Sequence, residues 1–321
     1  MKRWLVLGGS GFVGRALCEQ LVDQHGGGGV RITVPTRRRA HARHLLPLPT
    51  VEVVEASVHD EKALMRLLAG CDGVVNLIAI LHGSKGEFEQ AHVGLPQRLA
   101  AACVRAGVQR VVHVSALGVP DDPASAPSNY LRTKAAGELA LRAAGLDLTV
   151  LRPSVVFGAH DRFLNLFAQL QAALPIVPLA GSGATFQPVW VGDLARALAR
   201  CLADPTTAGQ TYECVGPQVY TLRQLVELAG WFSGHPRPVM PVPDWVGRAQ
   251  AFVMSLLPGE PMMSKDNLDS MRVPNVATGR WPGLEALGVT PTLLTSIAPL
   301  YLPGKHTGGE QLNDWRSRAG R

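Results

Sequence analysis

Tyr130 and Lys134 are the residues of this chain whose types and spacing best suit chemistry. Four residues apart, they share one face if the segment between them is helical. An ammonium group close to a phenol lowers the pKa of the phenol from about 10, so Tyr130 could exchange a proton with a carbonyl or an alcohol. The alternative is an ordinary surface pair. We favour the functional pair, because the chain has only 4 tyrosines and this one begins a predicted helix after the fifth predicted strand.

A glycine-rich turn near the N-terminus has the sequence pattern of a dinucleotide site. Residues 3–7 predict a buried strand and residues 12–24 an amphipathic helix, with glycines spaced GxxGxxG between them. Such a turn places backbone N–H groups and the positive end of a helix against a pyrophosphate. The predicted contacts are Gly8, Ser10, Gly11, Phe12, Val13 and Gly14. A glycine loop without a ligand is the alternative.

The end of the second predicted strand distinguishes NADP(H) from NAD(H). NAD sites usually carry Asp or Glu here, which accepts hydrogen bonds from the ribose hydroxyls. Residues 30–35 lead instead into Thr36, Arg37 and Arg38, with no acid nearby. A guanidinium can hold a 2′-phosphate through charge-assisted, bidentate hydrogen bonds. We therefore predict NADP(H), while a solvated basic loop remains the alternative reading of this run.

Composition narrows the class of protein. The 321 residues are 46% hydrophobic and only 17% charged, which makes a protein partner or a membrane surface plausible. The formal charge of +6 suits an acidic ligand or anionic lipid. The basic residues are not interleaved with aromatic residues, so the sequence does not indicate a nucleic-acid-binding surface. Five scattered cysteines predict free buried thiols in a reducing compartment. The histidines show no metal-ligand spacing, so we predict no metal site.

Strand and helix patterns alternate through the first half of the chain. This alternation predicts an α/β fold, a Rossmann-type doubly wound parallel sheet with a smaller, irregular C-terminal domain for substrate or partner. We expect an NADP(H)-binding domain over residues 1–153, completed by about 186–215, and a partly interleaved second domain over 154–321. The predicted strands are 3–7, 30–35, 51–55, 73–78, 109–115 and 147–152, and the predicted helices are 12–24, 60–70, 87–106 and 128–144.

Four sequence blocks resemble a known family. Residues 1 to about 235 resemble the extended or atypical short-chain dehydrogenases/reductases. The sharper blocks, residues 128–138, 152–158, 161–165 and 187–193, resemble the nucleotide-binding accessory subunits of respiratory complex I, NADH:ubiquinone oxidoreductase, and their bacterial homologues. That resemblance implies tightly held NADPH without established turnover, a role in assembly or stability of the complex, and relatives linked to ubiquinone biosynthesis.

The same resemblance implies further cofactor contacts after the later strands. Ser57 and Val58 stand where the superfamily contacts adenine, although a simple turn is an equal alternative. Residues 152–158 approach the nicotinamide amide in the superfamily. The implied contacts are Ser57, Val58, Leu77, Ala79, Pro153 and Val156, together with Tyr130 and Lys134.

Three positions depart from the pattern of active members. Ala116 occupies the place of the substrate-polarising Ser or Thr, so Ser115 would have to act from the neighbouring position as the third catalytic residue beside Tyr130 and Lys134. His92 aligns with the helix asparagine that supports a proton-relay water. Phe186 stands where sugar-nucleotide epimerases carry an arginine for the substrate diphosphate.

Two functions from different classes follow. The first is an NADP(H)-binding protein with a structural or assembly role linked to respiratory complex I or ubiquinone metabolism. The second is an active NADPH-dependent reductase, or an epimerase/dehydratase, acting on a hydrophobic carbonyl or quinone-pathway compound. We favour the first, in the cytoplasm or on the inner face of the cytoplasmic membrane, with a respiratory-complex or quinone-synthesis partner and a peripheral membrane contact.

Two further segments have alternative readings. Residues 244–257 carry apolar side chains at helical spacing, which predicts either a core helix or a helix lying on a membrane or a hydrophobic partner. Asp193 precedes an apolar helical run, so we expect an N-cap rather than a catalytic acid.

Overall fold

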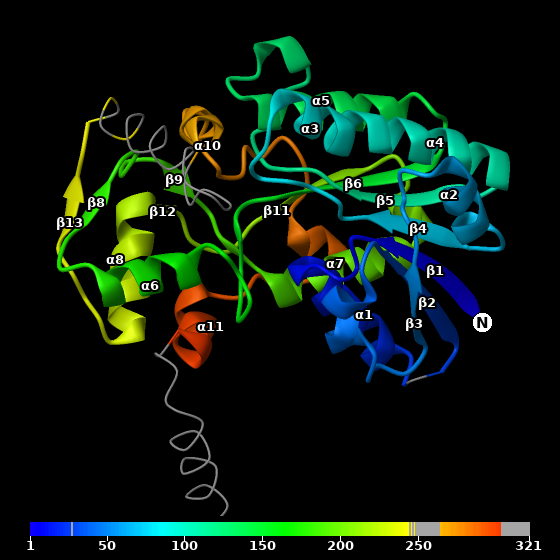
Figure 1. The fold of residues 1–321 in the computed structure, drawn as a ribbon, viewed down its shortest axis with the longest axis horizontal. Helices are drawn as coiled ribbons and strands as arrows, with labels where there is room; N and C mark the ends of the chain where they lie inside the picture. The colour runs from blue at the N-terminus through cyan, green and yellow to red at the C-terminus, as the bar shows by residue number, and fades with distance from the viewer. Residues whose placement is uncertain (27, 244, 246, 248–263, 303–321) are drawn as a thin grey trace, which may run out of the picture.

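The fold centres on one seven-stranded sheet in which all neighbouring strands are parallel. A computed structural model describes residues 1–302 except 27, 244, 246 and 248–263 (Figure 1). Across the sheet the order is β11 (Thr211–Cys214), β6 (Asp147–Pro153), β5 (Arg110–Val114), β4 (Gly73–Asn76), β1 (Lys2–Leu7), β2 (Val30–Thr36) and β3 (Val51–Glu55). The chain reverses its direction of winding between β1 and β4, which is where ligands bind in such sheets.

Helices cover both faces of the sheet, as the alternating sequence pattern requires. The face covered by α1 (Phe12–Gln24) and α7 (Val191–Ala203) buries Val6, Ile32 and Leu198. The opposite face is covered by α2 (Glu61–Leu68), α4 (Leu95–Ala106) and α5 (Asn129–Arg142), and it buries Leu5 and Leu99. Buried on both sides, the central strands β1, β4 and β5 carry runs of apolar residues.

A second lobe packs beside the carboxyl edge of the sheet (Figure 1). Its core joins side chains of Phe157, Leu164, Phe186, Leu225 and Ala298. Its helices are α6 (Leu164–Ala173), α8 (Leu222–Ser233), α10 (Lys265–Ser270) and α11 (Leu294–Tyr301), and its short strands are β7 (Val156–Phe157), β8 (Val177–Leu179), β9 (Thr185–Phe186), β10 (Val189–Trp190), β12 (Tyr220–Thr221) and β13 (Val239–Pro241).

Short helical turns complete the connections. These are η1 (Arg39–Leu45), α3 (Lys85–Glu89), η2 (Gln90–Gly94), η3 (Pro123–Ser125), η4 (Pro205–Thr207) and η5 (Leu284–Leu287). The prediction of a doubly wound parallel sheet with a smaller lobe is confirmed. The helix predicted over 87–106 runs without a break from 85 to 106 and contains the π-helical turn η2 between α3 and α4.

Two sequence expectations have different outcomes. The N-cap expected at Asp193 is wrong, since α7 begins two residues earlier and Asp193 lies inside it. Its buried carboxylate instead accepts hydrogen bonds from the backbone N–H and the hydroxyl of Thr292 at 2.7 and 3.0 Å. The helix expected over 244–257 lies outside the described residues, apart from Trp245 and Gly247.

Candidate functional site

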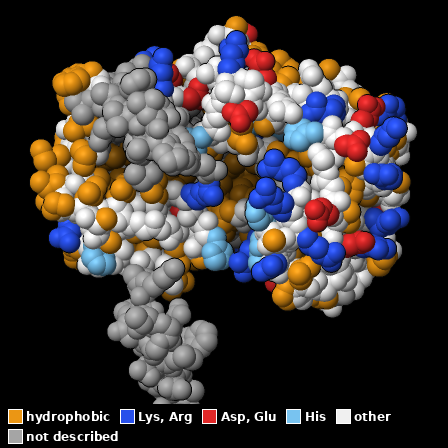
Figure 2. Space-filling view, viewed as in Figure 1, with side chains coloured by type: hydrophobic (Ala, Val, Ile, Leu, Met, Phe, Trp, Pro, Cys, Tyr) orange, Lys and Arg blue, Asp and Glu red, His pale blue; other side chains and the backbone are white. Residues whose placement is uncertain are grey.

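The predicted site residues lie together along the carboxyl edge of the parallel sheet. The glycine turn follows β1 at the centre, Arg37 and Arg38 follow β2 on one side, and Tyr130 begins the helix after β5 on the other. Parallel strands end at the same edge, so an extended dinucleotide laid across it has its adenosine end at β2 and its nicotinamide end at β5 and β6. Figure 2 shows a central hollow with Lys, Arg and His side chains gathered along its border on the side of the sheet.

The glycine turn has the geometry of a pyrophosphate cradle. Gly8 has a φ of +80°, which favours glycine, and a Cβ on Gly14 would lie 2.4 Å from the carbonyl oxygen of Gly8. A Cβ on Gly11 would meet only that carbonyl oxygen, at 3.2 Å, so this side of the turn is open. Gly11 is the N-cap of α1 and supplies no side-chain cap, which leaves the first N–H groups of the helix for an anion.

The basic end of the site joins residues from several elements. Arg37 and Arg38 are exposed directly after β2, and the backbone between them is fixed by Thr36, whose hydroxyl donates to the carbonyl oxygen of Arg38 at 3.1 Å. The pKa of His59 is lowered by burial and then by the nearby charges of Arg98 and Arg37. Cationic groups thus gather at the β2 and β3 end of the site.

Tyr130 and Lys134 lie in the first two turns of α5, but the expected effect on the phenol is absent. Burial raises the pKa of Tyr130 to about 12 and lowers the pKa of Lys134 to about 8. The Lys134 ammonium donates a hydrogen bond to the carbonyl oxygen of Val114 at 2.9 Å. The expectation of a lowered tyrosine pKa was therefore wrong, because burial of the phenol is the larger effect.

His92 is held on both ring nitrogens. The backbone N–H of Ile80 donates to His92 Nε2 at 3.0 Å, so Nδ1 carries the proton and donates to the hydroxyl of Thr133, also at 3.0 Å. Thr133 in turn donates to the carbonyl oxygen of Asn129 at 2.8 Å. Burial, followed by the charge of Lys134, lowers the pKa of His92 to about 3. The ring is a neutral structural link between the loop after β4 and α5.

Two aromatic rings pack against the ring of Tyr130. His92 packs edge-to-face on Tyr130 with ring centroids 5.4 Å apart, and Phe88 does so at 6.4 Å. The π-helical turn brings His92 into this position, and π-turns often occur at functional sites. Desolvation by burial accounts for the raised pKa of Tyr130.

Ser115 shows the strongest sign of a missing ligand partner. It follows β5, is buried, and its hydroxyl has no hydrogen-bond partner. A buried hydroxyl without a partner costs about 1–3 kcal/mol, so such a group often marks a ligand position. Ala116, beside it, is buried and supplies no hydroxyl. The residues present therefore fit a dinucleotide at this edge.

The remaining predicted contacts also follow strands of the sheet. Val58 is buried in the core, whereas Ser57 accepts a hydrogen bond from the backbone N–H of His59 at 3.3 Å. Leu77 packs against the core and Ala79 is exposed in the loop after β4. Pro153 ends β6 and Val156 begins β7. All six lie at the carboxyl edge with the glycine turn.

Phe186 lies in an apolar cluster in the second lobe. Its ring is 5.8 Å from that of Phe163, which is 5.2 Å from Phe167. Phe186 is 9% exposed. The side chain of Phe186 carries no charge that could bind a diphosphate.

Some residues of the site could not be found from local sequence. Asp266, in α10, accepts hydrogen bonds from the backbone N–H groups of Asn129 and Tyr130. Asn275 binds the loop after β6. Both reach the site from more than 100 residues further along the chain, and no motif connects them to it.

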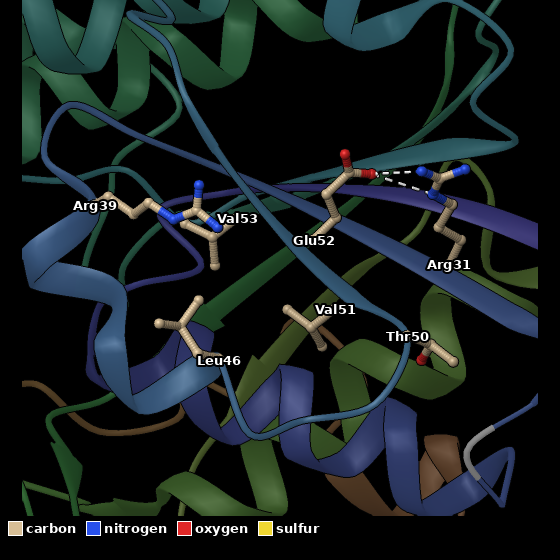
Figure 3. A pocket seen from close by; sticks show the side chains of 7 residues that line it. All are labelled: Arg31, Arg39, Leu46, Thr50, Val51, Glu52 and Val53. Atoms are coloured by element: carbon tan, nitrogen blue, oxygen red, sulfur yellow. Dashed lines mark hydrogen bonds and ion pairs between the residues drawn. The ribbon is translucent and has the colours of Figure 1, made fainter.

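A hollow beside β3 lies apart from this site. Figure 3 shows the ion pair between Arg31 and Glu52, 2.7 Å apart, at its rim. The rest is lined by the side chains of Arg39, Leu46, Thr50, Val51 and Val53. It carries none of the predicted site residues.

Comparison with known proteins identifies the family. Residues 4–214 match the NAD dependent epimerase/dehydratase family, so the chain belongs to that family. Its relatives include the mitochondrial NADH dehydrogenase (ubiquinone) 1 alpha subcomplex subunit 9 of Mus musculus, 33% identical over 90% of this chain and 76% of the relative. The NADH-ubiquinone oxidoreductase 40 kDa subunit of Neurospora crassa is 28% identical over 92% and 78%.

Solved structures give the same fold. The dTDP-glucose 4,6-dehydratase DesIV of Streptomyces venezuelae, solved with NAD bound, superposes with a TM-score of 0.72 at 23% identity and covers 94% of this chain and 95% of its own. The expected resemblance to complex I accessory subunits and to extended short-chain dehydrogenases/reductases is confirmed.

Other expectations concern metals, thiols and membranes. Among the described residues, no cluster of His, Cys, Asp or Glu is arranged to hold a metal ion. All five cysteines are free, and four are buried. None of the described helices has the length and apolar character that crossing a membrane requires.

Proposed function

We propose that this protein holds NADP(H) as a structural ligand and serves the stability or assembly of a respiratory complex of the NADH:ubiquinone oxidoreductase type. The relatives named as subunits of that enzyme support the partner, and the family supports a nicotinamide dinucleotide. The basic residues Arg37 and Arg38, without an acid, support NADP(H) over NAD(H).

The observation that carries this proposal is the fixed state of His92. Both ring nitrogens are engaged within the protein, one of them to a backbone N–H, so the ring has no free nitrogen for a proton-relay water. Burial raises the pKa of Tyr130 to about 12, so its phenol is a weaker acid than that of an exposed tyrosine. His92 therefore fixes the loop after β4 that lines the cofactor site, and this role favours a protein that binds the cofactor over an enzyme that turns it over.

A bound dinucleotide stabilises the fold without any chemistry. At a thousandfold excess over its dissociation constant, a ligand adds about 4 kcal/mol to the free energy of unfolding. The protein should be purified without added nucleotide, denatured, and the released nucleotide identified by mass spectrometry. Release of NADPH or NADP⁺ near one equivalent supports the proposal, and a nucleotide-free protein that gains no thermal stability from NADPH contradicts it.

The partner is tested separately from the cofactor. Deleting the gene in its own cell should lower the amount of assembled NADH:ubiquinone oxidoreductase, measured on native gels, and unchanged assembly opposes this role. We also propose a peripheral contact at the inner face of the cytoplasmic membrane, and residues 244–257 have two predicted uses, a core helix or a helix on the membrane or the partner. For a helix on the membrane or the partner, replacing Phe252 and Leu256 by Ser should reduce membrane or partner association with little change in melting temperature, whereas a large loss of stability indicates a core helix.

An active NADPH-dependent reductase, or epimerase/dehydratase, for a hydrophobic carbonyl or quinone-pathway compound is the second candidate. It is favoured by the retained Tyr130 and Lys134 and by the unpartnered hydroxyl of Ser115. In that role Tyr130 would exchange the proton while Lys134 held the ribose. The bound cofactor would supply or accept the hydride. Oxidation of NADPH on adding quinone precursors, lost in Tyr130→Phe, would establish this alternative.

A further inference from the structure

A segment from the second lobe contacts the nicotinamide end of the candidate site at several points. We call residues 264–277 the strap. It begins with α10, which lies at the start of α5 in Figure 1, and then continues past the ends of β5 and β6. The site's own strands and helices come from the first half of the chain, so the strap reaches them through tertiary contacts alone.

Asp266 of the strap caps the helix that carries Tyr130 and Lys134. Its two carboxylate oxygens accept hydrogen bonds from the backbone N–H of Asn129 at 2.8 Å and of Tyr130 at 3.0 Å. Ser128 accepts from the N–H of Leu131 at 3.2 Å, so two side chains together satisfy the first three N–H groups of α5. The negative carboxylate also lies at the positive end of the helix dipole.

A second hydrogen bond joins the same two elements. Ser270, at the end of α10, donates to the hydroxyl of the buried Ser128 at 2.8 Å. Val273 packs in a cluster with Ala116, Leu131 and Tyr130. The strap therefore contacts the tyrosine itself, the turn after β5 and the first turn of α5.

The strap also fixes the loop after β6. The side-chain oxygen of Asn275 accepts hydrogen bonds from the hydroxyl of Ser154 at 2.6 Å and from the backbone N–H of Val155 at 3.0 Å. Ser154 and Val155 stand between Pro153 and Val156, the predicted nicotinamide contacts. The nicotinamide end of the site is thus shaped by both the sheet and the strap.

We infer that docking of the strap and binding of the dinucleotide are thermodynamically coupled, with Asp266 as the positioning residue that links them through α5. This rests on the proposed cofactor binding. Because coupling is reciprocal, a strap that orients Lys134 for the ribose must itself be held more firmly when the cofactor is bound. Occupancy of the site is thereby transmitted to a surface segment of the second lobe.

The first measurement is cofactor affinity by calorimetry on the full chain. Asp266→Asn keeps the size of the side chain but removes the charge and one acceptor, so NADPH should bind about fivefold or more weakly. Asp121→Asn is the matched control, because it removes an exposed carboxylate that pairs with Arg280 at the surface. We expect the control to stay within about twofold of the unmodified protein.

The route of coupling is tested by a double-mutant cycle. In a Lys134→Ala background, Asp266→Asn should weaken NADPH binding much less than it does alone, because the contact that α5 positions has been removed. Equal effects in the two backgrounds would show a general loss of structure and overturn the inference.

Hydrogen exchange supplies a readout that needs no variant. In the unmodified protein NADPH should slow exchange at residues 264–270 and 129–131, and the slowing at 264–270 should be lost in Asp266→Asn. No slowing at 264–270 despite bound NADPH overturns the coupling, as does unchanged affinity of Asp266→Asn. Failure of the unmodified protein to bind NADPH overturns the proposed function instead. If Asp266→Asn does not fold, Ser270→Ala replaces it, and unchanged affinity there counts against the inference.

Discussion

The backbone N–H of Ile80 donates a hydrogen bond to Nε2 of His92, 3.0 Å away. Through Nδ1 and Thr133 the same ring reaches the backbone of α5. The loop that lines the centre of the candidate site is thereby tied to the helix that carries Tyr130 and Lys134. The position where active members of the superfamily carry an asparagine for a proton-relay water holds a histidine here, and that histidine connects two parts of the fold.

Acid should destabilise the protein through His92. Its folded pKa of about 3 lies below the unfolded value of 6.5, so the stabilising contribution is complete above pH 6.5 and is lost as the pH falls toward 3. His92→Gln retains an acceptor and a donor but does not titrate. The loss of unfolding free energy between pH 7 and pH 4, measured in urea, should be smaller in this variant by about 2–4 kcal/mol. Equal acid sensitivity would contradict the assignment.

Cofactor preference should depend on the basic residues after β2. NADPH should bind at least about tenfold more tightly than NADH, because a guanidinium pairs with the 2′-phosphate. The double variant Arg37→Ala, Arg38→Ala should lose this preference, with Arg105→Ala as a control on a cation that pairs with Glu61. Equal affinities of the unmodified protein for the two cofactors, by calorimetry, would rule out the assignment.

Substitutions of Tyr130 and of Lys134 should affect NADPH affinity differently. Tyr130→Phe should leave NADPH affinity nearly unchanged, whereas Lys134→Ala should weaken it, because only the ammonium is expected to hold the ribose hydroxyls. Any NADPH turnover should disappear in Tyr130→Phe. Circular dichroism establishes that each variant is folded. Loss of binding in a folded Tyr130→Phe protein would contradict this division of roles.

The parallel sheet could be predicted from sequence because its strands are local apolar runs with helical patterns between them. The glycine turn and the basic residues after β2 were readable for the same reason, since each motif is contiguous. What escaped prediction depends on tertiary contacts. Asp266 caps a helix whose N-terminus is 137 residues away along the chain, and nothing in its own neighbourhood indicates this.

The electrostatic environment of individual side chains also could not be predicted from the sequence. The sequence placed an ammonium near a phenol and so predicted a lower pKa for Tyr130, but Phe88 and His92 pack against the ring and burial raises this pKa. Likewise Asp193 was expected at the start of a helix. It lies within the helix and holds Thr292, a partner 99 residues later that no local pattern reveals.

Alkaline pH should weaken cofactor binding through Lys134. Burial lowers its pKa from 10.5 to about 8, so the ammonium loses its proton as the pH rises through that value. Only the protonated form carries the charge that attracts the anionic cofactor and all three donors. NADPH affinity should fall between pH 7 and pH 9.5 in the unmodified protein. Lys134→Ala should show a flatter profile, and identical profiles would contradict the role of this lysine.

Close approach of α5 to the π-helical turn should depend on Gly137. A Cβ at this position would lie 2.0 Å from the carbonyl oxygen of His92, which is backbone and cannot move aside as a flexible side chain could. Gly137→Ala should therefore lower the free energy of unfolding by about 1–3 kcal/mol and weaken NADPH binding by displacing Lys134. Gly86→Ala is the matched control, because a Cβ there meets nothing within 4 Å and alanine is the better helix former. Denaturant unfolding of both variants checks this. Equal free energies of unfolding for Gly137→Ala and Gly86→Ala would show that α5 can move away from the π-helical turn without loss of stability. The close packing of these two elements would then not explain how Lys134 is positioned.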